Sequence, residues 1–329
     1  MENKCRAKIT GIGIYLPEKI LTNKHLEATV DTSDEWIRTR TGIEERRIVD
    51  DSEACSDLGT RAALMAMENA GVSSEDIDLI IVATLTPDMV WPSTACLIQE
   101  KIGAFKAAAY DLSAGCTGFI YALATATQFV ETGFYKNVLV IGAEVMSKIV
   151  NWEDRNTCIL FGDGAGAVVL QPSQNSAGIL ANYLGSDGRG AHLLKQPAGG
   201  SSLPPTHQTV DDKLHTIYMN GNEVFKFAVR VMGEASLKVL EIAGVDKEEV
   251  DLLIPHQANM RIVESATKRL NLSPEKVVVN LNKYGNMSSA SIPVALYEAY
   301  MNQRICEGQK ILLVGFGAGL TWGATLIQW

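Results

Sequence analysis

Several features that define common classes of protein are missing from this chain of 329 residues. No uninterrupted apolar run approaches the roughly 20 residues that cross a bilayer. The opening stretch, MENKCRAKITGIGIYLP, lacks the cationic and apolar segments of a secretory signal. Positive charge is in deficit, with 29 Lys and Arg against 38 Asp and Glu and a net charge of −9. We therefore expect a cytoplasmic protein whose main partners are neither nucleic acids nor membranes, because both favour a basic surface.

Patterns for metal binding and disulfide formation are missing as well. The chain has six cysteines, at positions 5, 55, 96, 116, 158 and 306, and they form neither a Cys-x-x-Cys pair nor a Cys/His cluster at zinc spacing. We expect no metal and no redox cofactor. Each cysteine is first interpreted as a small buried apolar residue, so a reactive one must be identified from its surroundings.

An internal repeat is present and indicates how the chain is organised. Residues 63–81, ALMAMENAGVSSEDIDLII, align without a gap to 236–254, SLKVLEIAGVDKEEVDLLI, with 9 identities in 19 positions. In a similar register, AAAYDLSAGC, which ends at Cys116, pairs with VVVNLNKYGN, which ends at Asn286, and KNVLVIGAE pairs with KILLVGFGAG. We therefore predict two copies of one α/β unit.

Each copy has the pattern of a buried α/β unit, with a helix ending in Ala-Gly-Val, strands, a second helix and further strands. Runs of Ile, Leu and Val without alternation predict strands buried on both faces. The helix after Cys116 is apolar all round, so two sheets should enclose it. We place the halves at residues 1–172 and 173–329, divided near the turn-rich stretch 171–178. The irregular stretch 185–208 is too long for a plain connector, and we expect it to cover a site.

Three polar side chains lie where chemistry is expected. Cys116 and Asn286 occupy equivalent strand-to-helix junctions of the two copies, so a pseudo-twofold relation would make them neighbours. His256 follows an apolar strand, and ligand sites in α/β folds collect at strand ends. A thiol at a helix N-terminus beside an imidazole should have a lowered pKa. Because His and Asn can also donate hydrogen bonds to an oxyanion or enolate, the trio suits acyl transfer through an acyl-cysteine.

With these residues in view, the chain resembles the β-ketoacyl-acyl-carrier-protein synthase III family, thiolase-fold enzymes that initiate bacterial fatty acid synthesis. The motifs that carry the resemblance are DLSAGCTGF, LFGDGAGAVVL, PHQANMRI, KYGNMSSASIP and GFGAGLTWGATL. The resemblance implies a thiolase-like five-layer α-β-α-β-α sandwich. It also implies a decarboxylative Claisen condensation, without a cofactor, of an acyl-CoA primer such as acetyl-CoA with malonyl-acyl carrier protein. The products are a 3-oxoacyl carrier protein, CoA and CO2.

The same resemblance implies roles for individual residues. Cys116 would attack the acyl-CoA thioester, and His256 and Asn286 would stabilise the enolate formed on decarboxylation. Backbone N–H groups of Cys116 and Ala318 would form a second oxyanion hole, although many relatives carry glycine at the latter position. The residues implied in CoA binding are Thr32, Trp36, Arg40, Arg155, Asn222 and Asn259. From the residues alone, Trp36 beside Arg38 and Arg40 suits adenine and phosphates but is equally typical of a helix with a core tryptophan and solvated arginines.

Two further surfaces follow from the sequence. Arg261, Lys268 and Arg269 share one face of the helix after His256, where an acidic carrier protein could dock. By the resemblance, Lys226 matches a lysine that the family uses at this surface. The alternative to a docking surface is an ordinary solvated helix face. The resemblance also implies a homodimer in which Trp91, often phenylalanine in relatives, enters the partner's acyl pocket. The resemblance further implies that Phe161, in the LFGDGAG motif, belongs to the acyl pocket.

Three other readings remain open from the sequence. A papain-like cysteine hydrolase also has Cys, His and Asn in this order, but such enzymes lack a duplicated half. A related thiolase-fold starter or polyketide condensing enzyme shares the trio, although plant-type members use free malonyl-CoA and need no basic helix. A non-catalytic acyl-binding protein of the same fold is the third.

Overall fold

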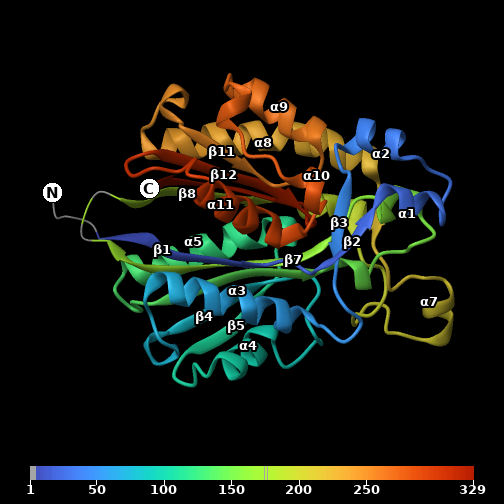
Figure 1. The fold of residues 1–329 in the computed structure, drawn as a ribbon, viewed down its shortest axis with the longest axis horizontal. Coiled ribbons are helices and arrows are strands. Elements are labelled where there is room, and N and C mark those ends of the chain that lie inside the picture. Colours follow the sequence, from blue (N-terminus) through green and yellow to red (C-terminus); the bar gives the residue numbers. More distant parts are fainter. Residues whose placement is uncertain (1–4, 174, 176) are drawn as a thin grey trace.

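The computed structural model, which describes residues 5–173, 175 and 177–329, is a stack of two sheets with helices between and outside them (Figure 1). Helices α5 and α11 lie between the sheets, α8 and α9 cover one outer face, and α3 and α4 cover the other. The predicted five-layer α-β-α-β-α sandwich is confirmed. These layer helices are α3 (Cys55–Ala70), α4 (Thr94–Ile102), α5 (Gly118–Glu131), α8 (Gly221–Ala243), α9 (Met260–Leu270) and α11 (Ser291–Met301).

The first sheet has the strand order β1-β7-β6-β4-β5. Its strands are β1 (Arg6–Tyr15), β4 (Leu79–Ala83), β5 (Ala108–Leu112), β6 (Val138–Val145) and β7 (Asp163–Ser173). β4 runs parallel to both β5 and β6, whereas β7 is antiparallel to β6 and β1. Every residue of β4 and β6 is buried, as unbroken apolar runs predict for strands covered on both faces.

The second sheet repeats this arrangement with the strand order β11-β12-β13-β8. Its strands are β8 (Gly178–Ser186), β11 (Leu252–Pro255), β12 (Lys310–Gly317) and β13 (Thr321–Gln328). β11 is parallel to β12, and β13 is antiparallel to β12 and β8. The four strands therefore correspond to β1, β4, β6 and β7. Of the turn-rich stretch 171–178, residues 174 and 176 lie outside the described residues.

The counterpart of β5 in the second copy departs from the prediction. VVVN, residues 277–280, forms only an isolated parallel bridge from Val277 to Leu253 instead of a short strand. The side chain of Gln257 bonds to backbone groups that would otherwise pair with a neighbouring strand. It donates to Val278 O at 3.1 Å and accepts from Asn280 N at 3.0 Å. The strand is thus replaced by a segment bonded to the turn that follows β11.

The central helices bring the two copies together. α5 is buried along most of its length, as predicted, and a short 3-10 turn precedes both α5 and α11. These turns are η2 (Gly115–Thr117) and η7 (Ser288–Ala290). At Gly142 of β6 the packing against η7 is so close that an added Cβ would lie 2.4 Å from Ser289 O.

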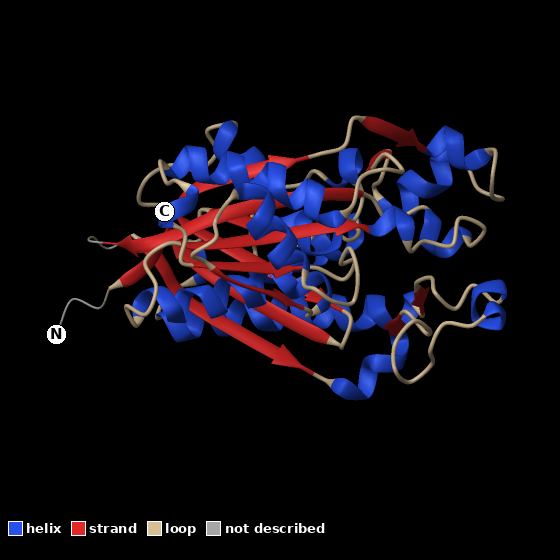
Figure 2. Ribbon diagram, turned by 90° about the horizontal axis from the view of Figure 1, so that it is seen from below, coloured by secondary structure: helices blue, strands red, loops and turns tan. Residues whose placement is uncertain are grey.

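Smaller elements gather at the end of the stack that lies opposite the C-terminus, as Figure 1 and Figure 2 both show. They are β2 (Lys19–Thr22), β3 (Glu45–Ile48), β9 (Leu194–Lys195), β10 (Tyr218–Met219), α1 (Asn23–Glu27), α2 (Asp34–Thr41), α6 (Arg155–Cys158), α7 (His207–Asp211) and α10 (Leu281–Tyr284). The other 3-10 turns are η1 (Ser74–Asp76), η3 (Met146–Lys148), η4 (Gly188–Leu193), η5 (Lys247–Glu249) and η6 (Pro274–Lys276). Among the described helices, none is long and apolar enough to pass through a bilayer.

The contact between the copies can be tested at Gly142. We expect Gly142→Ala to destabilise the protein by about 2 kcal/mol, because overpacking a tight contact typically costs 1–3 kcal/mol. Thermal and denaturant unfolding would measure the change. Gly188→Ala is the matched control, since a Cβ at Gly188 meets no atom within 4 Å. Equal stability of the two variants would contradict the close packing.

Candidate active site

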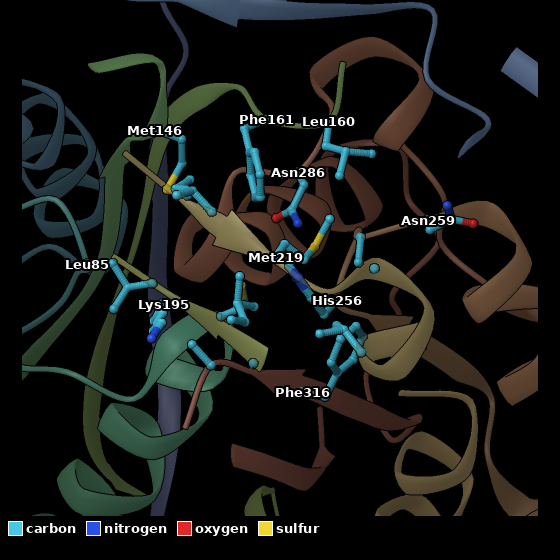
Figure 3. Close-up of a pocket in the computed structure, with 18 of the residues that line it drawn as sticks. Leu85, Met146, Leu160, Phe161, Lys195, Met219, His256, Asn259, Asn286 and Phe316 are labelled. Carbon is cyan, nitrogen blue, oxygen red and sulfur yellow. The ribbon is translucent and has the colours of Figure 1, made fainter. Parts of the chain in front are cut away.

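A cavity of about 270 Å³ opens between the two copies, and Cys116, His256 and Asn286 all line it. Figure 3 shows His256 and Asn286 in its wall. The structure therefore brings the three predicted side chains together. The rest of the wall is mainly apolar: Leu85, Met146, Ile149, Leu160, Phe161, Leu194, Ile217, Met219, Val224, Phe225, Ala258, Ile262 and Phe316. Residues 194–196 also line the cavity, so the irregular stretch 185–208 does help to cover a site.

The backbone around Cys116 contacts the end of β12. Gly115 has φ +59°, and a Cβ there would lie 2.6 Å from Ala318 N. A Cβ on Gly317 would lie 2.4 Å from Cys116 N. Ala318 is outside the left-handed region and so accommodates its own Cβ. Because its N–H makes no hydrogen bond within the described chain, Ala318 has an available backbone donor next to Cys116, and both residues line the cavity.

The thiol is less acidic than the sequence predicted. Burial is the main cause that raises the pKa of Cys116 to about 12; the nearby Ser288 hydroxyl acts in the opposite direction, and the charge of Glu144 adds a smaller rise. Burial also lowers the pKa of His256 to about 3, so its imidazole is neutral. The expected lowering of the thiol pKa is wrong because a neutral imidazole offers no positive charge to a thiolate, and desolvation outweighs the remaining effects.

His256 is positioned by strand β11 and by its neighbours. Its N–H donates to Val314 O on β12 at 2.8 Å, and its ring meets Phe316 edge-on with 5.6 Å between ring centres. The next residue, Gln257, is fully buried and donates to Pro255 O at 2.7 Å. Within the described chain the Nδ1 atom of His256 is buried and has no hydrogen-bond partner. The backbone of the turn is thus fixed, whereas the ring that lines the cavity makes no hydrogen bond through Nδ1 within the described chain.

Asn286 is held from both copies. Its N–H donates to Leu160 O at 2.8 Å, and its carbonyl accepts from Gly162 N at 3.1 Å. Its side-chain oxygen accepts from Ser288 N at 2.8 Å. Because this bond occupies the oxygen, the carboxamide presents its NH2 group, which makes no hydrogen bond within the described residues, to the cavity.

The cluster of Trp36, Arg40 and Arg155 lies beside one end of the cavity. Both guanidinium groups are 5.2 Å from the centre of the Trp36 ring, and Arg155 also donates to Asp31 O at 2.8 Å. Asn259 lines the cavity and donates to Arg40 O at 3.1 Å, which connects the cavity to this cluster. A planar base can stack between Trp36 and Arg155 only if the Arg155 side chain moves away from the ring.

The remaining predicted residues are more dispersed. Phe161 is 4% exposed and lines the cavity, whereas Trp91 is 81% exposed and lies outside the cavity of its own chain. Thr32 has a buried hydroxyl without a partner in the described chain. Asn222 is exposed and does not line the cavity, although its neighbour Gly221 does.

The predicted basic residues lie on exposed faces of two adjacent helices, α8 and α9. We define the basic face as Lys226, Arg230, Arg261, Lys268 and Arg269. Arg261 stacks on Phe225, a cavity residue, at 5.0 Å, which places the face next to the cavity. Lys226 pairs with Glu223 at 2.7 Å. Arg230, which follows Lys226 by one helical turn, was missed in the sequence, although its i+4 spacing could have revealed it.

Sequence reasoning also missed a buried polar group below the cavity. Glu144, at the end of β6, is fully buried and accepts a hydrogen bond from Ser289 Oγ at 2.9 Å. The available signal was an acidic residue ending the wholly apolar strand of KNVLVIGAE. In the described chain, no group of three or more His, Cys, Asp and Glu side chains could hold a metal ion.

Comparisons with known proteins agree across the whole chain. Residues 110–188 match the family model of 3-oxoacyl-[acyl-carrier-protein (ACP)] synthase III, and residues 240–329 match the model of its C-terminal part. A beta-ketoacyl-[acyl-carrier-protein] synthase III from Caldanaerobacter subterraneus subsp. tengcongensis is 60% identical, covering 100% of this chain and 99% of the relative. One from Clostridioides difficile is 58% identical, covering 98% of each chain. The crystal structure of 3-oxoacyl-[acyl-carrier-protein] synthase III from Aquifex aeolicus VF5 superposes with a TM-score of 0.92 at 50% identity, covering 98% of this chain and 100% of that one.

The raised thiol pKa has a direct test. The rate at which iodoacetamide alkylates Cys116 should climb about tenfold per pH unit from pH 7 to pH 10, because the reactive thiolate fraction is small and grows with pH throughout this range. Mass spectrometry of the Cys116 peptide would separate this reaction from alkylation of the exposed Cys96 and Cys306. A rate that levels off below pH 8 would show instead that the thiol is activated.

Proposed function

Because the chain belongs to the 3-oxoacyl-[acyl-carrier-protein] synthase III family, and is an acyltransferase that initiates fatty acid biosynthesis, we propose that it condenses acetyl-CoA with malonyl-acyl carrier protein through an acyl thioester on Cys116. One observation carries the proposal. Cys116, His256, Asn286 and Ala318, which carry the thiol, the imidazole, the carboxamide and a free backbone N–H, all line one cavity between the copies. The reaction uses two thioester substrates and calls for no resident cofactor.

The first step transfers the acetyl group to the enzyme. The Cys116 sulfur attacks the thioester carbonyl while the backbone N–H groups of Cys116 and Ala318 donate to the developing oxyanion. The carbon–sulfur bond to CoA then breaks, and CoA leaves as the free thiol. Since the pKa of Cys116 is raised to about 12, the thiol proton must leave as the sulfur attacks. Neutral His256 is placed in the same cavity to receive it and to pass it to the departing CoA sulfur.

The second step forms the new carbon–carbon bond. Malonyl-carrier protein loses CO2, and the electron pair of the broken bond becomes the enolate of an acetyl thioester. The NH2 group of Asn286 and an N–H of His256 donate to the enolate oxygen, which a water-poor cavity favours. The enolate carbon attacks the acetyl-Cys116 carbonyl, and the carbon–sulfur bond to Cys116 breaks. The leaving sulfur takes up one proton from solvent to restore the thiol, and a 3-oxoacyl carrier protein is released.

The two ends of the cavity suit the two parts of an acyl-CoA. Figure 3 shows Asn259 on one side of His256 and Asn286, and Leu85 and Met146 on the other. We assign the Asn259 end, next to the Trp36 cluster, to the pantetheine arm and nucleotide of CoA, with Thr32, Arg40, Arg155 and Asn222 as further contacts. The opposite end, with its bulky apolar side chains, would hold a short acyl group.

We further propose that the chain works in the cytoplasm as a homodimer, built from halves 1–172 and 173–329 in each subunit. Val90 and Trp91 are 85% and 81% exposed, and such large apolar side chains are more stable against a partner than in water. Trp91 would complete the acyl pocket of the other subunit beside Phe161. The alternative of a polyketide starter enzyme differs in its carrier and primer, whereas a papain-like hydrolase does not have this fold.

The acyl-enzyme is the first thing to measure. Incubation with acetyl-CoA should give an acetyl adduct on Cys116, and Cys116→Ala should give none. Asn286→Ala should still acetylate but lose condensation by on the order of 10²–10³-fold for the lost donor. His256→Ala should slow both steps, because His256 receives the thiol proton in the first step and donates to the enolate in the second. Mass spectrometry and a condensation assay with a panel of acyl-CoA primers would follow the two steps. Absence of the adduct in wild type would leave only an acyl-binding role.

The basic face can be tested by charge reversal. Arg261→Glu should raise the KM for malonyl-carrier protein about tenfold, because it removes a cation from the docking surface of an acidic partner. The rise in KM should be larger at low salt, where the charges are less screened. Acetylation of Cys116 by acetyl-CoA should be unaffected. Lys106→Glu, an equal change of charge in the first copy, is the control. If both variants keep the wild-type KM, the carrier docks elsewhere.

A further inference from the structure

Glu144 is a buried carboxylate to which the proposed reaction gives no part. It stands at the end of β6 in the first copy and is 0% exposed. Its Oε2 atom accepts hydrogen bonds from Thr86 Oγ1 at 2.7 Å, Leu85 N at 3.1 Å and Thr84 Oγ1 at 3.3 Å. Its Oε1 atom accepts from Ser289 Oγ at 2.9 Å and Ser289 N at 3.4 Å. The carboxyl group therefore joins a loop of the first copy to η7 of the second.

Such a group is costly, and packing alone does not explain it. The hydrogen bonds that reach Glu144 come from neutral hydroxyl and backbone N–H groups, and burial raises its pKa. An acidic side chain out of water is favourable only where several donors are fixed around it. A fully bonded polar group in a core specifies one geometry of the segments it joins. Glu144 thus fixes where η7 lies relative to β6.

The segment that Glu144 fixes includes the turn that orients Asn286. Ser289 follows Asn286 by three residues, and the intervening Ser288 donates its N–H to Asn286 Oδ1 at 2.8 Å. Ser288 has φ +46°, a conformation that non-glycine residues adopt only when the surroundings hold it. The single hydroxyl hydrogen of Ser289 lies between two acceptors, Ala83 O at 2.7 Å and Glu144 Oε1 at 2.9 Å from Oγ, so the side chain is fixed between the two copies. If Ser289 were released, the turn could relax and the carboxamide could rotate.

We propose that Glu144 is a positioning residue for Asn286. By holding Ser289 it keeps the 286–289 turn in the conformation that occupies the carboxamide oxygen and leaves the NH2 group facing the cavity. The inference rests on the proposed function, in which Asn286 acts on the enolate of the second step and not on acetylation of Cys116. Glu144 touches no substrate, and beyond its smaller effect on the pKa of Cys116 it acts on the step that Asn286 serves.

Comparing the rate of Cys116 acetylation with the rate of malonyl-carrier-protein decarboxylation distinguishes this positioning role from a general contribution to folding. We expect Glu144→Ala to slow decarboxylation of malonyl-carrier protein by about 10²-fold, since displacement of a reacting group by about 1 Å costs that much. Acetylation of Cys116 by acetyl-CoA should not slow, because loss of the Glu144 charge removes one of the effects that raise the thiol pKa. Glu144→Gln, which keeps one acceptor oxygen, should fall between Glu144→Ala and wild type. Ser289→Ala, which leaves Glu144 in place, should reproduce the selective loss.

Thr86→Val is the matched control. It removes a 2.7 Å hydrogen bond from the same carboxylate, but on the side that does not face η7. The ratio of decarboxylation to acetylation should stay at the wild-type value in this variant. Both rates are measured on the full-length protein, by release of CO2 and by mass spectrometry of the Cys116 peptide.

The outcomes are distinct. Equal slowing of both half-reactions in Glu144→Ala, or the same selective loss in Thr86→Val, would overturn the positioning role. If Glu144→Ala does not fold, Ser289→Ala decides, and an unchanged ratio there overturns the inference. Wild-type protein that neither acetylates Cys116 nor releases CO2 would instead refute the proposed function on which the inference rests.

Discussion

The site depends on one backbone contact, in which Gly115 and Cys116 of the first copy pack against Gly317 and Ala318 of the second. No side chain fits between them, since a Cβ on Gly115 would lie 2.6 Å from Ala318 N and one on Gly317 would lie 2.4 Å from Cys116 N. The contact fixes the end of β12 against the nucleophile. The backbone N–H of His256 donates to Val314 O on β12, so the contact that fixes β12 against Cys116 also fixes the position of His256.

The same close packing keeps water from the reacting groups, and this decides the electrostatics. Desolvation leaves both Cys116 and His256 neutral, with pKa values of about 12 and about 3. The resting site therefore does not contain an ionised thiolate. It contains fixed N–H donors in a medium of low dielectric constant, where each hydrogen bond to a developing negative charge is stronger than in water. Charge then forms only as a substrate reacts and is met at once by donors already in place.

The features that the two copies share could be predicted from the sequence. The features that depend on side-chain hydrogen bonds or on the loss of water could not. Alignment of the copies predicted that the junctions at Cys116 and Asn286 meet, because equal strands end at equal places in a duplicated fold. It failed at residues 277–280, where the side chain of Gln257 bonds the backbone that a strand ladder would use. It also predicted the wrong direction for the Cys116 pKa, since a residue pattern shows that a thiol adjoins a helix but not how much water it loses.

The repeat also explains why two equivalent junctions perform different tasks. When KNVLVIGAE and KILLVGFGAG are aligned, Glu144 corresponds to Ala318, just as Cys116 corresponds to Asn286. Each strand end packs on the junction of the other copy: that of β12 on η2, and that of β6 on η7. At the first contact the small side chain of Ala318 leaves backbone N–H groups accessible beside the Cys116 sulfur. At the second a carboxylate binds a serine and so fixes a carboxamide. Divergence at two pairs of equivalent positions thus turns a symmetric fold into a site with a nucleophile on one side and a donor on the other.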